Sequence, residues 1–286
     1  MVKEIFKKTI YNRIAQYERC HPVSYCKSQW ENKTGKVNKL YIAYRWLHLL
    51  AVATIFFLSI VEYGKATNNI IYYLKWPVFL TNWALTALLA QAIMAAYLVT
   101  VAFSTTRSNI GSNNSKNGRL RIWIKVYSIV HSTAVVIAIG VSFVYWIFIY
   151  NPEVHELDLL NYLVHGANSI IMLIDFLLVG HPFKLAHSIY PLSLIFIYTI
   201  FNYFYYQFGG TDRKGNAYIY KVMDWRYPTK CLTFSLAGHV LVCVIYALLW
   251  LIFLGKRKLS IAFRLSSLKV TTNDLSATAP NSVSLV

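Results

Sequence analysis

Six apolar stretches, each long enough to cross a lipid bilayer as a helix, run through this chain. They lie at residues 41–60, 77–101, 126–149, 159–179, 189–208 and 231–254, and short polar or charged stretches separate them. A helix needs about 20 mainly apolar residues to cross a hydrocarbon layer of ~30 Å. Backbone groups facing lipid must form their hydrogen bonds within the segment, so each stretch is predicted to be helical. The sequence therefore predicts an all-α polytopic membrane protein, a bundle of six transmembrane helices.

The composition agrees with lipid as the surrounding solvent. Only 14% of the residues are charged and the mean hydropathy is +0.44, whereas a soluble domain carries about a quarter charged residues. The net charge of +17 is spread between and beyond the apolar stretches and does not gather on one soluble module. We therefore expect anionic lipid of the cytoplasmic leaflet to be the partner of these basic residues, and we exclude nucleic acid.

The basic residues also predict the orientation of the chain. Twenty Lys and Arg residues fall on the side of the membrane that holds both chain ends, and seven fall on the other side. Cytoplasmic segments carry the excess of Lys and Arg, so both termini are predicted to be cytoplasmic. The sequons that begin at Asn32 and Asn113 would then remain unglycosylated.

Three regions follow from this topology. Residues 1–40 form a basic cytoplasmic arm, residues 41–255 the transmembrane domain, and residues 256–286 a Ser/Thr-rich cytoplasmic tail that is predicted to be disordered. Apolar residues of the arm recur near helical spacing with Lys and Arg between them, which indicates an amphipathic helix on the inner leaflet. A disordered, solvated arm is the alternative.

The last three residues suggest a protein partner. The chain ends Ser284-Leu285-Val286, a pattern that PDZ domains bind by adding a strand and holding the terminal carboxylate. A chance match on a Ser/Thr-rich tail is the alternative.

Four short stretches carry a resemblance to a known family: residues 44–46 (YRW), 74–83 (LKWPVFLTNW), 161–175 (NYLVHGANSIIMLID) and 224–228 (DWRYP). They resemble the rolling stone family, whose founding member is an insect membrane protein linked to myoblast fusion. The similarity runs from Tyr41 to Leu254. It implies a multi-pass protein that acts in myoblast fusion or muscle development, in the plasma membrane rather than the endoplasmic reticulum.

At greater distance the layout is similar to the androgen-induced family of six-span threonine hydrolases. Those enzymes cleave fatty acid esters of hydroxy fatty acids with a Thr and a His. Two positions of this chain match, Thr81 in Leu80-Thr81 and His165 near the start of the fourth stretch. The resemblance implies Thr81 as nucleophile, His165 as base and a fatty acyl ester as substrate. Whether the chain is an enzyme stays open between these two resemblances.

The predicted topology allows one test of the Thr–His pair. At 1.5 Å per residue, Thr81 lies ~6 Å and His165 ~9 Å into their helices, both from the outer side. A neutral imidazole at that depth could accept the hydroxyl proton of Thr81. Asn82 and Asn168 lie at similar depth and are candidates for donating to a developing oxyanion. The alternative is that these polar side chains only hold helices together.

The remaining polar residues of the apolar stretches give weaker signals. Asp175 lies ten residues past His165, ~15 Å along the axis, too far to orient that imidazole. An acid within a membrane is a functional candidate, but we favour pairing with Lys184 or with a helix terminus. The histidines lack a compact ligand spacing, so neither a metal nor a cofactor is expected. The stretches show no ring of charges and no broken half-helices, which disfavours a channel or transporter.

Overall fold

The computed structural model describes residues 22–31, 37–64, 70–107, 114–153 and 157–277. Within these ranges the chain is helical, apart from connecting segments and one isolated bridge between Ser28 and Val179. The described residues contain six helical segments that are long and apolar enough to span a membrane, which confirms the predicted fold class. These segments run Lys39–Ile60, Leu80–Ser104, Arg121–Ile149, Leu159–Leu178, Leu185–Gln207 and Pro228–Ser266.

The long helices are α2 (Lys39–Ile60), α4 (Leu80–Arg107), α5 (Asn114–Val144), α7 (Asn168–Leu178), α8 (Ile189–Gln207) and α9 (Pro228–Ala277). Two shorter helices, α3 (Ile70–Leu74) and α6 (Leu159–Tyr162), lie between them. The single-turn segments are η1 (Pro22–Cys26), η2 (Trp76–Val78), η3 (Tyr145–Ile149), η4 (Leu163–Ala167), η5 (Leu185–Ser188) and η6 (Lys221–Met223). Of these, η3 and η4 are π-helical and extend the third and fourth spans.

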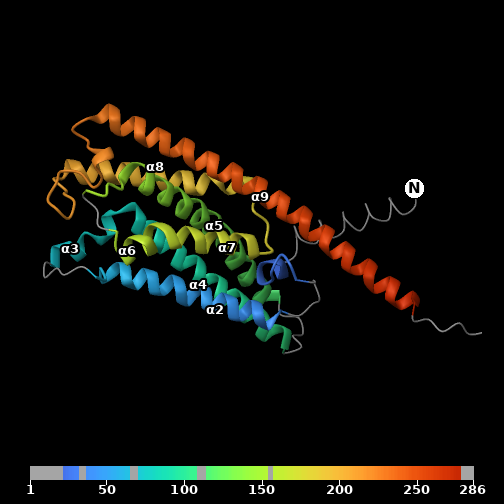
Figure 1. Cartoon of the computed structure of the whole chain (residues 1–286). Helices are drawn as coiled ribbons and strands as arrows, with labels where there is room; N and C mark the ends of the chain where they lie inside the picture. The colour runs from blue at the N-terminus through green and yellow to red at the C-terminus, as the bar shows by residue number, and fades with distance from the viewer. Residues whose placement is uncertain (1–21, 32–36, 65–69, 108–113, 154–156, 278–286) are drawn as a thin grey trace, which may run out of the picture.

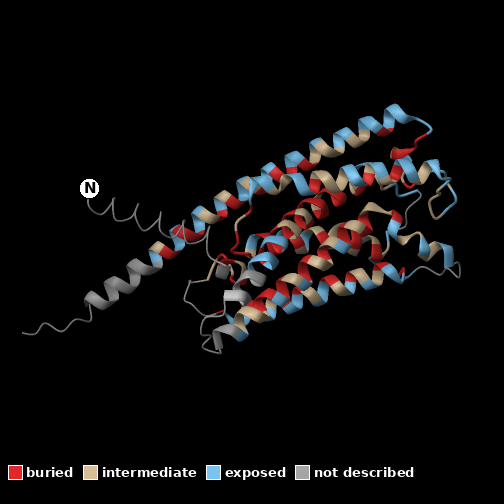
Figure 2. Ribbon diagram, turned by 180° about the vertical axis from the view of Figure 1, so that it is seen from behind, coloured by how far each residue is buried: buried red, intermediate tan, exposed pale blue. Residues whose placement is uncertain are grey.

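The bundle has a densely packed part and a looser part. Helices α2, α4, α5 and α7 lie together, while α8 and α9 cover one side of α5 (Figure 1). The buried residues face the middle of the bundle (Figure 2). The spans of α4 and α5, in the middle of the packed part, are 50% and 56% buried. The span of α8 is 17% buried, and those of α2 and α9 are each 28% buried. Apolar side chains therefore cover the outer surfaces of α8 and α9, as expected for helices in contact with lipid.

The two ends of the bundle differ. One end, here named the tail end, holds η1 and the part of α9 that extends beyond the other helices (Figure 1). Helix α9 continues without a break past residue 256, where the tail was predicted to begin, and reaches Ala277. The predicted amphipathic helix, both sequons and the PDZ-type terminus lie at least partly outside the described residues.

Residues 24–31 of the basic arm are built into the tail end. The backbone N–H of Gln29 donates to the carbonyl of Leu178 at 2.8 Å, and the N–H of Gly180 donates to the carbonyl of Lys27 at 3.0 Å. A Cβ atom at Gly180 would lie 2.9 Å from the Lys27 carbonyl oxygen, so only glycine allows this approach. Arg264 of α9 donates to the carbonyl of Gln29 at 2.7 Å, which holds the segment from the other side.

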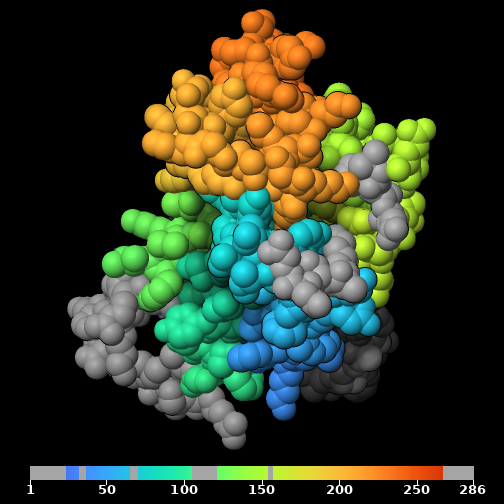
Figure 3. Space-filling view, turned by 90° about the vertical axis from the view of Figure 1, so that its left-hand side faces the viewer, coloured from blue at the N-terminus to red at the C-terminus, as the bar shows by residue number. Residues whose placement is uncertain are grey.

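The opposite end, here named the loop end, is closed by two connecting segments that dock on each other. The Lys75 ammonium donates to the Thr211 hydroxyl at 2.6 Å and to the Asp212 carbonyl at 2.8 Å. Arg213 forms an ion pair with the buried Glu62 at 2.5 Å. In the view of this end, the segment that follows α8 lies against the segment around residues 70–80 (Figure 3). The connections of this end therefore form one interlocked layer.

The orientation predicted from the basic residues can be tested by cysteine labelling in intact cells. Lys214 at the loop end and Lys258 at the tail end are both exposed, so Lys214→Cys and Lys258→Cys form a matched pair. We expect a membrane-impermeant maleimide to label Lys214→Cys in intact cells, and Lys258→Cys only after permeabilisation. The unmodified protein serves as the control for its own cysteines. The reverse pattern would contradict the predicted topology.

Candidate functional site

A buried ion pair joins the first and fourth spans. The Arg45 guanidinium of α2 donates to one carboxylate oxygen of Asp175 in α7 at 2.5 Å, and the two side chains are 1% and 0% exposed. Charges away from water are costly in a membrane protein unless they are paired and their remaining hydrogen bonds are satisfied. The surroundings of the pair therefore decide whether it is stable.

Polar partners surround the carboxylate of Asp175. The Tyr44 hydroxyl donates to the oxygen that Arg45 contacts, at 2.8 Å. The side-chain amide of Gln91 in α4 donates to the other oxygen at 3.0 Å, and Nε2 of His131 in α5 lies 3.2 Å from that same oxygen. The carboxylate of α7 thus has neighbours from the three other helices of the packed part of the bundle, α2, α4 and α5.

The guanidinium of Arg45 also has several hydrogen-bond acceptors. Its Nε and one terminal nitrogen donate to the Tyr41 hydroxyl at 3.1 and 2.7 Å, and the same terminal nitrogen donates to the Tyr127 hydroxyl at 3.2 Å. His48, one turn along α2, contacts the carbonyl oxygen of the Gln91 amide at 3.2 Å. We name these eight residues the Arg45–Asp175 cluster: Tyr41, Tyr44, Arg45, His48, Gln91, Tyr127, His131 and Asp175.

We expected from the sequence that Asp175 pairs with Lys184 or with a helix terminus. In the structure it pairs with neither. The side chain of Lys184 is exposed, and its carbonyl accepts a hydrogen bond from Tyr246. The partner is Arg45, which lies near the start of the first span, Lys39–Ile60. Opposite charges at matching depth in two apolar stretches were the signal for this pair. The expectation failed because it considered only the basic residue nearest along the chain.

The cluster continues toward the tail end through a histidine outside the spans. The ring of His181 meets the ring of His131 edge to face, with centroids 4.5 Å apart, and stacks on Tyr25 at 5.1 Å. Burial, reinforced by His131, Lys256 and Arg45, holds the pKa of His181 well below its ordinary value. His181 is therefore neutral near pH 7 and adds no second cation beside Arg45.

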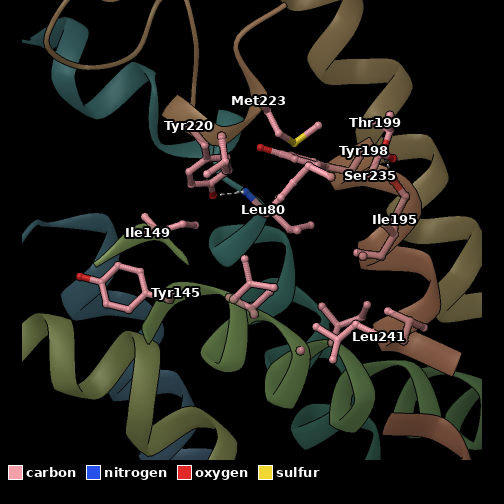
Figure 4. Close-up of a pocket in the computed structure, with 18 of the residues that line it drawn as sticks. Leu80, Tyr145, Ile149, Ile195, Tyr198, Thr199, Tyr220, Met223, Ser235 and Leu241 are labelled. Atoms are coloured by element: carbon pink, nitrogen blue, oxygen red, sulfur yellow. Dashed lines mark hydrogen bonds between the residues drawn. The ribbon is translucent and has the colours of Figure 1, made fainter. Parts of the chain in front are cut away.

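A cavity of about 80 Å³ lies in the loop-end half of the bundle (Figure 4). Helices α5, α8 and α9 form its sides, and the first residues of α4 together with η6 close it at the loop end. Aliphatic and aromatic side chains make up most of the wall, and no charged residue lines it. Six of the lining residues carry hydroxyl groups: Thr81, Tyr145, Tyr198, Thr199, Tyr220 and Ser235.

Of the two candidate catalytic residues, only Thr81 lines this cavity. Its side chain is a hydrogen-bonding neighbour of Tyr220, whose hydroxyl also accepts from the backbone N–H of Leu80 at 3.0 Å. His165 lies in the π-helical segment η4, where its ring stacks on Tyr145 with centroids 3.4 Å apart and an interplanar angle of 3°. Tyr145 lines the cavity, so it is the neighbour that connects the cavity with His165.

The hydrogen bond of the Thr81 side chain is with Tyr220, and His165 does not line the cavity. Thr81 and His165 both lie in the loop-end half of the bundle, as their places in the sequence indicate, but Thr81 is engaged with Tyr220. A Thr–His pair would need a hydrogen bond of about 2.6–3.2 Å in a reactive arrangement. In this arrangement Thr81 serves as a wall of the cavity.

The two candidate oxyanion donors hold helices and connections together. The Asn82 amide donates to the carbonyl of Trp76 at 2.5 Å, and its oxygen accepts from the Ser59 hydroxyl at 3.3 Å. Asn168 is fully buried between α5 and α7, and its side-chain oxygen accepts from the Ser142 hydroxyl at 3.1 Å. Neither residue lines the cavity. Within the described residues, no group of three His, Cys, Asp or Glu side chains is suited to hold a metal ion.

The Arg45–Asp175 cluster makes a prediction about stability. Arg45→Met leaves the Asp175 carboxylate buried without its cation, and we expect a loss of roughly 3–5 kcal/mol in the free energy of unfolding. The double variant Arg45→Met/Asp175→Leu removes both charges and should be more stable than Arg45→Met alone. Thermal unfolding of the purified protein in detergent, followed by tryptophan fluorescence, measures both effects.

Arg226→Met is the matched control for this measurement. Arg226 also pairs with an aspartate, Asp224 at 2.6 Å, but its side chain is 56% exposed at the loop end. Exposed ion pairs contribute little to stability, so this variant should melt close to the parent protein. Equal losses of stability in Arg45→Met and Arg226→Met would show that burial of the Arg45–Asp175 pair does not increase its contribution to stability.

Comparisons with known proteins agree with the resemblance. The chain matches the family model described as Rost: Protein rolling stone over residues 3–272. It is 28% identical over 253 residues to the Protein rolling stone of Drosophila melanogaster, in an alignment that covers 86% of this chain and 87% of that protein. No solved structure matches. Arg45 and Asp175 lie in two of the stretches that carry the resemblance. The chain is a multi-pass membrane protein of the rolling stone family.

Proposed function

We propose that this protein acts in myoblast fusion or muscle development through contacts made at the cell surface. The observation that carries the proposal is membership in the rolling stone family over residues 3–272, which includes all six spans. The role itself is the one that the family resemblance implies. Fusion requires a protein in the plasma membrane that presents a surface to the neighbouring cell.

The loop end is the surface that we assign to those contacts. Under the orientation predicted from the basic residues it faces outward. Arg213 ties its two connections together, because its guanidinium pairs with Glu62 and lies over the rings of Tyr72 and Phe79, at 4.4 and 4.9 Å from their centroids. A surface held in one shape by such contacts loses less conformational entropy on binding than a mobile loop.

A rescue experiment in cultured insect myoblasts tests the proposal. Depletion of the cells' own rolling stone protein should lower the fraction of nuclei in multinucleate cells, and expression of this chain should restore it. Arg213→Ala breaks the docking of the two connections and should restore fusion at least twofold less well. Lys214→Ala changes the neighbouring exposed residue and should restore fusion fully. Surface biotinylation confirms equal delivery, and failure of the parent chain at equal delivery would contradict the proposal.

A second candidate function is hydrolysis of lipid esters by Thr81 and His165. The observation in its favour is that Thr81 lines an apolar cavity and that Tyr145, which lines the same cavity, stacks on His165. An ester would enter this cavity with its acyl chain, and the Thr81 hydroxyl would have to exchange its hydrogen bond with Tyr220 for one with His165.

Ester hydrolysis by the purified protein distinguishes the two functions. For an enzyme, a panel of fatty acyl esters should be cleaved, and Thr81→Ala and His165→Ala should each lower the rate at least a hundredfold. Thr86→Ala, an exposed threonine on the same helix, should keep the parent rate. Absence of turnover, or equal turnover in all four proteins, would exclude the Thr81–His165 pair as the catalyst.

A further inference from the structure

The cavity between α5, α8 and α9 has a wall that suits hydrocarbon. Its hydroxyl groups already have partners within the protein. The Tyr198 hydroxyl donates to the carbonyl of Val78 at 3.0 Å. The hydroxyls of Thr199 and Ser235 bond to each other at 2.8 Å across α8 and α9. The cavity thus offers an occupant mainly carbon atoms and few groups that could recognise a polar or charged molecule.

Water does not fit such a space well. A buried water needs about two to four polar partners, and an apolar cavity of this kind stays dry or takes up an apolar molecule. A volume of about 80 Å³ is several times the ~10–15 Å³ needed to hold one water by the same kind of measure. The space is therefore large enough for part of an apolar ligand.

The location of the cavity identifies the source of that ligand. The cavity lies within the spans, and its sides include α8 and α9, whose spans are only 17% and 28% buried. Phe234 lines the cavity and meets Phe148 edge to face, with ring centroids 5.9 Å apart, and Phe148 is 53% exposed. Phe148 and Phe234 therefore form a contact that runs from the cavity wall to the exposed surface of the bundle.

We propose that this cavity binds the hydrocarbon chain of a membrane lipid, which enters from the bilayer beside Phe148 and Phe234. The hydrocarbon chain of the lipid makes carbon contacts with three helices, and it links the loosely packed α8 and α9 to α5. This site does not depend on the role in fusion, and it requires no cleavage of the lipid.

Glycines provide the means to fill the cavity by substitution. Gly238 of α9 lines it, and a Cβ atom built at Gly238 has no other atom within 4 Å. Gly238→Leu should therefore place a side chain in the space without a clash at its first atom. Gly255 lies on the same helix, also has nothing within 4 Å of its Cβ position, is exposed and does not line the cavity. Gly255→Leu is the matched control, because both changes raise helix propensity by the same amount.

Photocrosslinking of the full-length protein in nanodiscs tests the proposal. The probe is a phosphatidylcholine with a diazirine near the end of one acyl chain, and peptide mass spectrometry locates the adducts. We expect adducts on residues 140–149, 195–199 and 234–242. Gly238→Leu should lower those adducts at least fivefold, while Gly255→Leu should leave them unchanged. Labelling of lipid-facing residues such as Ile200 and Leu248 should be equal in all three proteins.

A competition on the parent protein makes the result independent of how the variants fold. When unlabelled phosphatidylcholine is added after the probe and samples are irradiated at successive times, the cavity adducts should decline more slowly than the adducts on Ile200, because a bound lipid leaves a site more slowly than a lipid leaves the outer surface of the protein. Adducts confined to lipid-facing residues, or equal cavity labelling in Gly238→Leu, would overturn the proposal. A diazirine sterol that labels the cavity in place of the acyl probe would also overturn it, since the occupant would then be a rigid ring system.

Discussion

The packed part of this bundle depends on one buried charge pair. Arg45 and Asp175 lie in the first and fourth spans, and their hydrogen bonds also engage α4 through Gln91 and α5 through Tyr127. Apolar contacts between helices give little preference for one helix arrangement when lipid offers similar contacts. A buried charge, in contrast, is stable only in arrangements that keep its oppositely charged and hydrogen-bonding partners beside it. Any relative shift of these four helices would leave a charge without a partner. The cluster thus specifies the arrangement on which the rest of the bundle is assembled.

The parts added to this frame are held by hydrogen bonds to helix ends. Lys256 of α9 donates to the carbonyls of Phe176 and Val179, the second at 2.9 Å, at the end of α7 where carbonyl groups lack helical partners. Gln29 of the arm donates to the Ser260 hydroxyl at 2.5 Å. The basic residues of the tail end therefore include some that fasten α9 and the arm to the bundle. A count of positive charges assigns all of them to lipid, because it does not distinguish a buried lysine from an exposed one.

The fold could be predicted from the sequence far better than the site. Length and hydropathy located six spans because both follow from the thickness of the bilayer, which is the same for every helix. The pairing of Arg45 with Asp175 depends on which helices are neighbours, and hydropathy carries no information on that point. The sequence also placed Thr81 and His165 at similar depth but gave no indication that Tyr145 would stack on His165. Depth follows from counting residues, whereas contact also requires rotation about each helix axis, which the two π-helical turns change locally.

The two halves of the bundle thus differ in how easily their helices can move. In the tail-end half, a buried charge pair with several hydrogen-bond partners makes helix movement costly, since each lost partner exposes a charge to an apolar interior. In the loop-end half, the third and fourth spans contain π-turns at η3 and η4, and an apolar cavity separates α5 from α8 and α9. Apolar surfaces can slide or repack at small cost when lipid fills the gap. A movement that follows the binding of a ligand is therefore expected between α5 and the pair α8 and α9, with the Arg45–Asp175 cluster as its fixed base.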